Sequence, residues 1–151
     1  MEFMDENFDL NKLVDEVVEN LNPASSHKII KRGGKPKIIF ADPKYISRII
    51  SNMIINAIKY SPGKDEIIVK VAGAKDSVTV SVQDYGRGIE KGKEQRIFEP
   101  YFRVETKKVE KISGLGLGLY IAREIASHYK GKIWVNSKIG QGSTFYFQMP
   151  C

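Results

Sequence analysis

The spacing of apolar residues predicts three helices. In LNKLVDEVVENL, leucine and valine recur every three or four residues directly after Asp9, a residue suited to a helix N-cap. A second helical pattern opens at Asp42-Pro43, a capping residue followed by a first-turn proline. It continues to about Tyr60, where Pro62-Gly63 ends it. A third helix is expected over about 117–130.

Alternating apolar and polar residues predict strands in the remaining segments. EIIVKVA and SVTVSVQD alternate on either side of the short connection GAKD and give the clearest antiparallel pair. GKIWVNS and STFYFQM predict two more strands near the end of the chain. In HKIIKRGGKPKIIFAD, two apolar runs flank Gly33-Gly34, which is the composition of a hairpin. Helices and mostly antiparallel strands in separate blocks indicate an α+β fold, a two-layer α/β sandwich.

Length and composition indicate one soluble domain. A chain of 151 residues is typical of a single domain, which we place at 9–151, with 1–8 as an N-terminal linker or cloning remnant. No apolar run approaches the ~18 residues of a membrane span. The acidic start MEFMDENFDL lacks the basic and apolar parts of a signal peptide, so we expect a cytoplasmic location. One cysteine and two histidines offer neither an internal disulfide nor a metal cluster of the usual spacing.

The formal net charge of +6 suits an anionic partner. The lysines are scattered along the chain, however, and are not gathered in one block interleaved with aromatic residues. A lysine-rich, solvated surface is therefore the favoured interpretation, and we expect no nucleic-acid binding.

One face of the second predicted helix carries polar residues among many apolar ones. Asn52, Asn56 and the pair Lys59-Tyr60 fall at i, i+4 and i+7/i+8 and share this face. Asparagine is a mediocre helix former, and a buried amide costs free energy unless it has a partner. Two interpretations stay open: a stripe facing solvent, or an amide oxygen that binds a hard cation together with phosphates, beside a lysine that supplies charge.

The motif DYGRGI follows a predicted strand directly. Gly86 and Gly88 allow the backbone to approach a flat ligand, while the carboxylate of Asp84 accepts a hydrogen bond from an exocyclic amine. The amino group of adenine meets this requirement, whereas guanine presents an oxygen to the same carboxylate. Ordinary turns use the same residue types, so this motif alone is a weak signal.

The glycine-rich run SGLGLGL precedes the third predicted helix. Its glycines free backbone amides for an anion, and the helix that follows offers its N-terminal N–H groups to phosphate. No Gly-Lys-Ser/Thr sequence follows, which excludes a P-loop, and no acidic residue stands at the dinucleotide-binding spacing. The preceding segment RVETKKVEKIS is charged with little apolar period and is expected to be a mobile surface loop.

Five motifs in a fixed order carry a family resemblance. NMIINAIKYSP, DYGRGI, FEPYFR, GLGLGL and GQGSTFYF resemble the N, G1, F, G2 and G3 boxes of the ATP-binding catalytic domain of bacterial sensor histidine kinases. The resemblance covers about 9–150. It implies the Bergerat ATP-binding fold shared with gyrase, Hsp90 and MutL, in which helices cover one face of a mixed, mostly antiparallel sheet. It also implies a flexible lid at about 103–116.

The resemblance implies ATP and Mg²⁺ as cofactors and assigns site residues to both. Asn56 matches the magnesium ligand, Asp84 the adenine-reading carboxylate, and Thr144 the G3 hydroxyl near adenine. Asn52, Lys59 and Arg103 are the implied catalytic residues. Nucleotide binding is assigned to Asn56, Lys59, Tyr60, Asp84, Gly86, Gly88, Ile89, Phe102, Arg103, Gly114, Leu115, Gly116, Leu117, Gly118, Leu119 and Thr144. In the F box, Phe98, Tyr101 and Phe102 match, and Tyr101 and Phe102 are candidates either for a docking surface or for core packing.

The implied activity is transfer of the γ-phosphoryl group of Mg-ATP to a histidine in two-component signal transduction. Hydrolysing members of the wider group resemble one another in carrying Glu four residues before the magnesium-binding Asn, where this chain has Asn52. An amide is no general base at neutral pH, whereas much of an imidazole acceptor is already neutral at pH 7. Transfer to histidine is therefore favoured over hydrolysis. A clamp-type ATPase or a serine-directed switch kinase of the same fold is the alternative, and a basic nucleic-acid-binding module is less favoured.

The phosphoacceptor histidine is expected outside this chain. Neither His27 nor His128 lies in a sequence that resembles the family's phosphoacceptor box; we expect a packing role for His128 and a surface position for His27. The implied partner is the helical dimerisation and phosphoacceptor domain of a parent kinase, with a response regulator served indirectly. We expect the isolated domain to be monomeric, to lack membrane contact of its own, and to bind ATP without autophosphorylation, as a cytoplasmic part of a soluble or membrane-anchored kinase.

Overall fold

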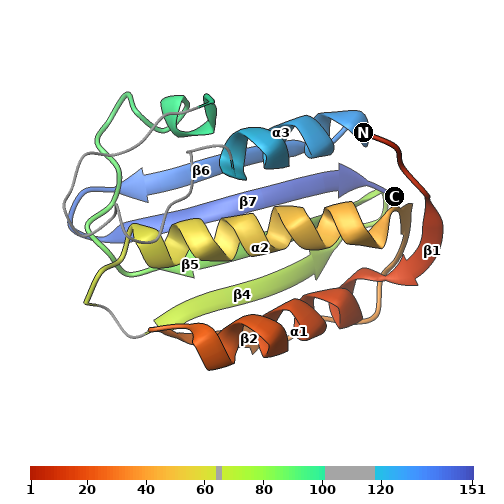
Figure 1. Cartoon of the computed structure of the whole chain (residues 1–151), viewed down its shortest axis with the longest axis horizontal. Helices are drawn as coiled ribbons and strands as arrows, with labels where there is room; N and C mark the ends of the chain where they lie inside the picture. Colours follow the sequence, from red (N-terminus) through yellow and green to blue (C-terminus); the bar gives the residue numbers. More distant parts are fainter. Residues whose placement is uncertain (64–65, 101–117) are drawn as a thin grey trace.

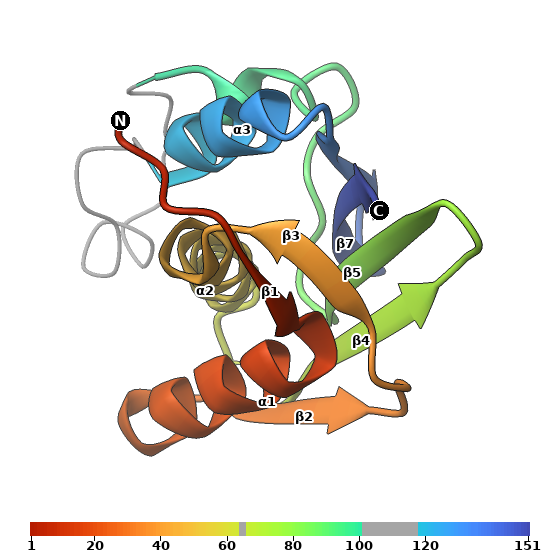
Figure 2. The same ribbon diagram turned by 90° about the vertical axis from the view of Figure 1, so that its right-hand side faces the viewer.

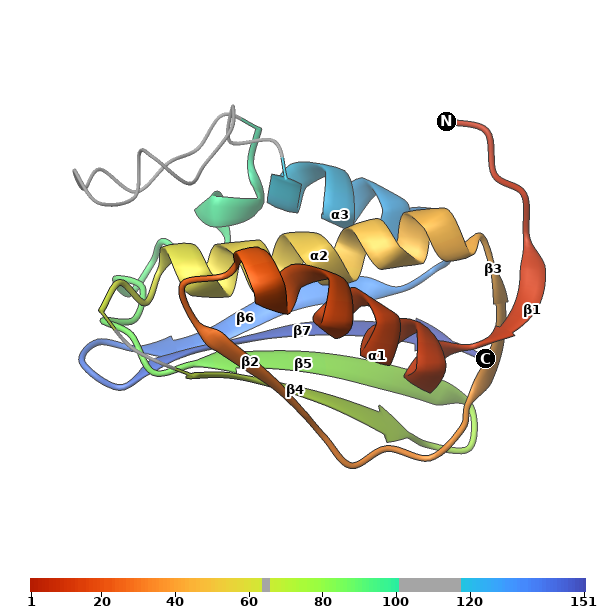
Figure 3. The same ribbon diagram turned by 60° about the horizontal axis from the view of Figure 1, so that its bottom comes forward.

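In the computed structural model, which describes residues 1–63, 66–100 and 118–151, helices form one layer and a mixed sheet the other (Figure 1). The sheet has five strands in the order β2-β4-β5-β7-β6, and a two-stranded sheet of β1 and β3 lies at one end. Figure 3 shows all three labelled helices on the same side of the large sheet. The predicted α+β two-layer sandwich is confirmed.

The bounds of the elements follow the predicted patterns closely. The helices are α1 (Leu10–Leu21), α2 (Pro43–Lys59) and α3 (Gly118–His128), with short 3-10 turns η1 (Asn22–Ala24) and η2 (Arg96–Phe98). The strands are β1 (Glu6–Asp9), β2 (Lys28–Arg32), β3 (Ile38–Ala41), β4 (Glu66–Gly73), β5 (Ser77–Asp84), β6 (Lys132–Lys138) and β7 (Gly142–Pro150).

Helix α2 is the central element of the core. Its N-terminus is capped by Asp42, whose carboxylate accepts a hydrogen bond from the Lys44 N–H at 3.0 Å, followed by Pro43 in the first turn. Figure 2 shows α2 between α1 and α3, with the strands of the large sheet to its side. Apolar side chains cover most of its circumference and are buried against these neighbours: Ile46, Ile49, Ile50, Met53, Ile54 and Ala57. Because this apolar face is buried, the helix is held in place, and so are its polar residues.

The β4–β5 hairpin and β7 set the register of the sheet. β4 pairs antiparallel with β5, with Ile67 opposite Asp84 and Val69 opposite Val82. Side chains alternate between the two faces of a strand, so Val78, Val80, Val82 and Asp84 all face the helices and are buried. The predicted antiparallel pair is confirmed, and its last residue delivers a carboxylate into the interface between the layers.

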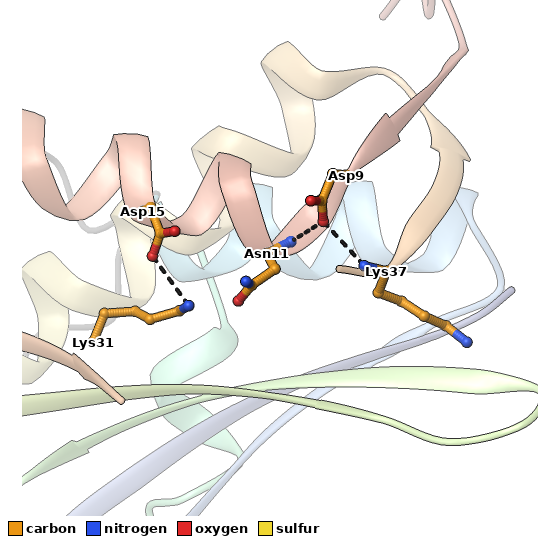
Figure 4. Close-up of polar contacts among 5 residues, drawn as sticks. All are labelled: Asp9, Asn11, Asp15, Lys31 and Lys37. Carbon is orange, nitrogen blue, oxygen red and sulfur yellow. Dashed lines mark hydrogen bonds and ion pairs between the residues drawn. The ribbon is translucent and has the colours of Figure 1, made fainter. Parts of the chain in front are cut away.

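The expected hairpin around Gly33-Gly34 is wrong. β2 pairs in parallel with β4, and β3 pairs antiparallel with β1, so the two apolar runs join different sheets. The cause is the start of α1 (Figure 4), where one carboxylate oxygen of Asp9 accepts hydrogen bonds from Asn11 N–H and Lys37 N–H, both at 3.0 Å. The cap of α1 therefore holds the chain just before β3 and keeps it away from β2.

The end of β2 and the connection that follows it also contact α1 (Figure 4). Lys31 forms an ion pair of 3.1 Å with Asp15, and only 12% of the Lys31 side chain is exposed. Gly34 has φ +99° and lies against the side chain of Asn11, where an added Cβ would collide with the amide oxygen. Gly34 thus serves the passage of the chain across α1, and the two glycines do not form a hairpin turn.

The N-terminal residues pack on the domain, although 1–8 were expected to be a linker. Glu6–Asp9 form β1 on β3, and the Phe3 ring stacks on His128 with 3.7 Å between ring centroids and 6° between planes. The hydroxyl of Tyr129 donates a hydrogen bond of 2.6 Å to Asp5. The contacts of Phe3 and Asp5 depend on residues more than a hundred positions away, which a local pattern does not reveal. They also give His128 the packing contact that was expected of it.

Candidate functional site

The site residues converge where the end of β5, the C-terminal end of α2, the start of α3 and the β6–β7 turn meet. Asp84 ends β5, Lys59 ends α2, and Gly118 begins α3. A hydrogen bond of 3.0 Å from the Asn52 amide nitrogen to the Gly118 carbonyl joins α2 to α3 directly. Gly142 at the start of β7 packs on the backbone of Asp84. Sequence motifs that are more than 20 residues apart thus surround one location.

Asp84 is a buried carboxylate with only one oxygen satisfied. Its Oδ1 accepts hydrogen bonds from the Gly86 N–H at 2.9 Å and the Ser143 N–H at 3.2 Å. Its Oδ2 is buried and has no hydrogen-bond partner among the described residues. Because a buried polar group is normally paired, an open carboxylate oxygen held in one orientation indicates a place for a ligand that donates a hydrogen bond.

Burial raises the pKa of Asp84 to about 6, and the hydrogen bonds from the two backbone N–H donors lower it. The dominant cause is the loss of water around a residue that is only 1% exposed. The carboxyl group is therefore mostly ionised at pH 7 and becomes protonated as the pH falls below 6. A ligand that donates to Oδ2 favours the ionised form.

Two glycines in the turn after Asp84 are required by close packing. A Cβ on Gly86 would collide with the Tyr60 carbonyl oxygen and lie 2.6 Å from the Ser61 Cα. Gly88 has φ +78° and packs on the Lys138 carbonyl. In the structure, these glycines let the turn lie against the end of α2 and the β6–β7 turn. That they also let the backbone approach a ligand stays a prediction.

The two asparagines of α2 are not a simple solvent-facing stripe. Both are half-buried; Asn52 holds the Gly118 carbonyl, and the Asn56 amide nitrogen donates to the Asn52 carbonyl at 2.8 Å. This bond directs the amide nitrogen of Asn56 into its own helix and leaves the amide oxygen as the atom that could face a cation. Mg²⁺ commonly takes one or two protein oxygens and completes its shell with phosphates and water, so a single amide oxygen fits this role.

Lys59 and Tyr60 lie at the C-terminal end of α2 and are largely enclosed. Lys59 is 5% and Tyr60 2% exposed, and the ammonium group lies 5.8 Å from the centroid of the Tyr60 ring. The Tyr60 ring also stacks on Phe145 of β7 at 6.2 Å. Burial raises the pKa of Tyr60 to about 12, so this residue stays neutral at physiological pH. The aromatic ring thus forms part of the core beneath the site.

The structure places Ser143, not Thr144, beside the buried carboxylate. On β7, Ser143, Phe145 and Phe147 are buried toward the helices, whereas Thr144 pairs with Gln83 and points to the other face. The Ser143 hydroxyl lies 2.9 Å from the Ser137 hydroxyl, and its N–H donates to Asp84. The period-two pattern that ends in two buried phenylalanines could have identified Ser143, since residues two apart share a face.

His27 was expected at the surface, and this expectation is wrong. It is 7% exposed, and its Nε2 lies 2.8 Å from the Ser61 carbonyl oxygen, immediately after the end of α2. A lone histidine in the polar segment ASSHK gives no local signal of burial. Its position results from the passage of the chain between η1 and β2 beneath the end of α2.

Several predicted residues lie outside the described residues. They are Tyr101, Phe102, Arg103, Gly114, Leu115, Gly116 and Leu117, together with the rest of the predicted lid. Of the remaining candidates, Ile89 and Leu119 are 3% and 4% exposed and belong to the core, as does Phe98 at 4%. Within the ranges that the structure describes, no helix is long and apolar enough to cross a membrane.

A buried carboxylate with one unpaired oxygen suits a small ligand that donates a hydrogen bond. Comparison with known proteins gives the family. The profile of the histidine kinase-, DNA gyrase B- and HSP90-like ATPases matches residues 41–151. The chain belongs to this family. The resemblance inferred from the five motifs is confirmed.

The most similar relatives include sensor kinases. The sensor protein kinase WalK of Staphylococcus epidermidis is 33% identical over 147 residues, which are 95% of this chain and 24% of that protein. WalK of Staphylococcus aureus strain JH9 matches with the same identity and coverage. The chain spans about a quarter of the length of these two relatives.

Solved structures of histidine kinases share the fold. The nucleotide-free catalytic domain of the histidine kinase ThkA has a TM-score of 0.79 and 29% identity, covering 99% of this chain and 96% of that one. Full-length ShkA in complex with AMPPNP has a TM-score of 0.84 and 26% identity, covering 99% of this chain and 32% of that one. Both matches extend over nearly the whole chain, including the residues before 41.

A single methyl group at Gly86 should disrupt the site. We expect Gly86→Ala to displace the turn after Asp84, because its Cβ would meet the backbone of Tyr60 and Ser61. The cost is about 1–3 kcal/mol of unfolding free energy, measured by urea denaturation. Gly73→Ala is the matched control, since the nearest atom to its added Cβ is the flexible Lys37 side chain at 3.6 Å. Equal stability of the two variants would contradict this account of the turn.

Proposed function

We propose that this chain is the ATP-binding catalytic domain of a sensor histidine kinase, and that it transfers the γ-phosphoryl group of Mg-ATP to a histidine on a separate helical domain. Membership of the ATPase family, sensor-kinase relatives and the likeness to histidine kinase catalytic domains support this proposal. The single observation that carries it is the open Oδ2 of Asp84, because its chemistry selects the base of the nucleotide.

The buried carboxylate suits adenine. Gly86 and Ser143 occupy Oδ1, so Oδ2 is the atom available to accept from an exocyclic amine. Adenine carries an amine at this position of its ring, whereas guanine carries an oxygen that would face a negative charge. A ligand that leaves this buried oxygen unpaired, or places an oxygen against it, therefore loses more affinity than it would at a carboxylate in water.

The phosphates would lie between α2 and the start of α3. The Asn56 amide oxygen would hold Mg²⁺, Lys59 would supply positive charge, and the first N–H groups of α3 would face an anion. The bond from Asn52 to the Gly118 carbonyl fixes the start of α3 relative to α2. Arg103 and the glycines at 114 and 116 remain proposed contacts to the phosphates.

The chemistry asks little of the protein beyond positioning and charge. A bond forms between an imidazole nitrogen and the γ-phosphorus while the bond to the leaving ADP oxygen breaks, in line. A Mg²⁺ ion held by the Asn56 amide oxygen would neutralise charge on the phosphate oxygens. Asn52, whose amide nitrogen is already committed to the Gly118 carbonyl, has no basic group to activate water. The site therefore favours a neutral imidazole as acceptor over hydrolysis.

Neither histidine of this chain is suited to be the acceptor. The two ring nitrogens of His27 lie within hydrogen-bond distance of Ser26 and Ser61, and the ring of His128 is stacked on Phe3. We propose that the acceptor belongs to a helical dimerisation domain of the parent kinase, which then serves a response regulator. The isolated chain is proposed to be a monomer.

Replacement of Asp84 by asparagine should abolish adenine recognition. Gly86 and Ser143 require an oxygen at the Oδ1 position, so the asparagine would turn its NH₂ group toward the amine of adenine, donor against donor. We expect the affinity for Mg-ATP to fall by about 10- to 100-fold, since a hydrogen bond to a charged group contributes about 1.5–3 kcal/mol. Isothermal titration calorimetry measures this change. Asp76→Asn, an exposed carboxylate in the β4–β5 connection, should bind as the wild type does; unchanged binding in Asp84→Asn would refute the site.

Adenosine affinity should depend on pH through Asp84. The pKa of about 6 in the free protein means that the ionised acceptor is present at pH 7 and lost as the pH falls below 6. A ligand that needs the ionised form should bind with constant affinity above about pH 7 and progressively more weakly below pH 6. Adenosine carries no titrating phosphate, and NMR titration at several pH values follows its binding. The profile should flatten in Asp84→Asn; a flat profile in the wild type would contradict adenine recognition by this carboxylate.

The isolated chain should bind ATP without modifying itself. Incubation with γ-labelled ATP and Mg²⁺ should give no acid-labile phosphohistidine and little release of phosphate, because both histidines have structural contacts and Asn52 offers no general base for water. Phosphohistidine on the chain would disprove the separate acceptor. Steady ATP turnover that disappears in Asn52→Ala would instead indicate the clamp-type ATPase.

A further inference from the structure

His27 is a buried residue that none of the five motifs contains. It lies between η1 and β2, outside the part of the chain that matches the ATPase family. Its side chain nonetheless extends to the C-terminal end of α2, where Lys59 and Tyr60 form one border of the site. A histidine buried to 7% exposure in this location is held by specific partners.

The hydrogen bonds of His27 define its tautomer. Nε2 lies 2.8 Å from the Ser61 carbonyl oxygen and 3.1 Å from its hydroxyl, while Nδ1 lies 2.9 Å from the Ser26 hydroxyl. A carbonyl oxygen only accepts, so Nε2 carries the hydrogen and donates to it. The Ser26 hydroxyl can then donate to Nδ1. The neutral imidazole is fully paired in this arrangement and acts as a strut from the N-terminal segment to Ser61.

Ser61 connects this strut to the adenine-reading carboxylate. It is fully buried, and its hydroxyl donates to the Ala57 carbonyl at 2.7 Å, which ties it to the last turn of α2. Gly86 packs on the same residue, with its Cβ position 2.6 Å from the Ser61 Cα. The N–H of Gly86 in turn orients Oδ1 of Asp84. A shift of Ser61 would therefore move Gly86, whose N–H orients the Asp84 carboxylate and with it Oδ2.

We propose that His27 is a positioning residue for adenine recognition: its Nε2–H holds the Ser61 carbonyl, and Ser61 sets the place of the turn that aims Asp84. The inference rests on the proposed function, because it assigns a residue to the base-binding part of that site. It extends the site to a segment that precedes the matched family region. The effect of His27 falls on base recognition and does not involve direct contact with the phosphates.

Two substitutions of His27 with side chains of different length distinguish a positioning role from a purely structural one. A glutamine at position 27 places an amide N–H near the location of Nε2 and can still donate to Ser61, whereas an asparagine is shorter and cannot reach it. We expect His27→Asn to weaken binding of both adenosine and Mg-ATP by about 10-fold, in the range found for residues that orient a primary ligand. His27→Gln should recover most of this loss. Calorimetry gives the affinities, and circular dichroism verifies that each variant is folded.

Asn22→Ala is the matched control for local destabilisation. Asn22 binds the backbone of Ile29 in both directions, at 3.0 Å and 2.9 Å, and so anchors the same segment without any described contact to Ser61. This variant should lose stability toward urea while its adenosine affinity stays within about two-fold of the wild type. If Asn22→Ala loses as much affinity as His27→Asn, or if glutamine binds as weakly as asparagine, the positioning role is overturned.

The outcomes distinguish this inference from the proposed function. If wild-type protein binds adenosine and Asp84→Asn does not, but folded His27→Asn binds as the wild type does, the inference alone fails. If the wild type does not bind adenosine, both fail. If His27→Asn does not fold, imidazole ¹⁵N spectra of the wild type decide: an Nε2-protonated ring whose signals shift on adenosine binding supports the strut, and an Nδ1-protonated or unresponsive ring overturns it.

Discussion

A carboxylate buried at the junction of two layers is the constraint on which the site depends. Removing Asp84 from water costs free energy that its two backbone hydrogen bonds recover only in part, and its pKa of about 6 reflects this balance. The structure tolerates the cost because the turn after Asp84 packs closely on the end of α2 and on the β6–β7 turn. The same packing holds Oδ2 in one orientation. The close packing that makes burial of Asp84 costly is thus also what allows Asp84 to select a ligand.

Helix α2 combines the core and the site in one element. Its apolar side chains fill the space between the sheet, α1 and α3, while Asn52 and Asn56 occupy the remaining stripe. Because the helix is fixed by its buried face, the amides are held without a large loss of side-chain entropy on binding. This arrangement suits chemistry that relies on preorganised charge and position more than on a reactive side chain.

Local sequence patterns identified most of the elements. The alternation in β4 and β5 placed Asp84 at a strand end, and the caps Asp9 and Asp42 marked two helix starts, because these signals act over a few residues. The hairpin around Gly33-Gly34 failed for the opposite reason. Its two apolar runs are paired by β4 and by β1, and the hydrogen bond that the Lys37 N–H donates to Asp9 spans 28 residues. Ser143 was missed although the alternation along β7 contained the signal.

The sequence by itself determined the three helices, most of the strands and the nature of the layers, since periodicity and caps depend on local geometry. Only the tertiary structure decided which strands pair, which of Ser143 and Thr144 faces Asp84, and that His27 is buried against Ser61. Those outcomes depend on contacts between distant segments, where the close packing of the whole chain, and not the spacing of neighbouring residues, selects one arrangement.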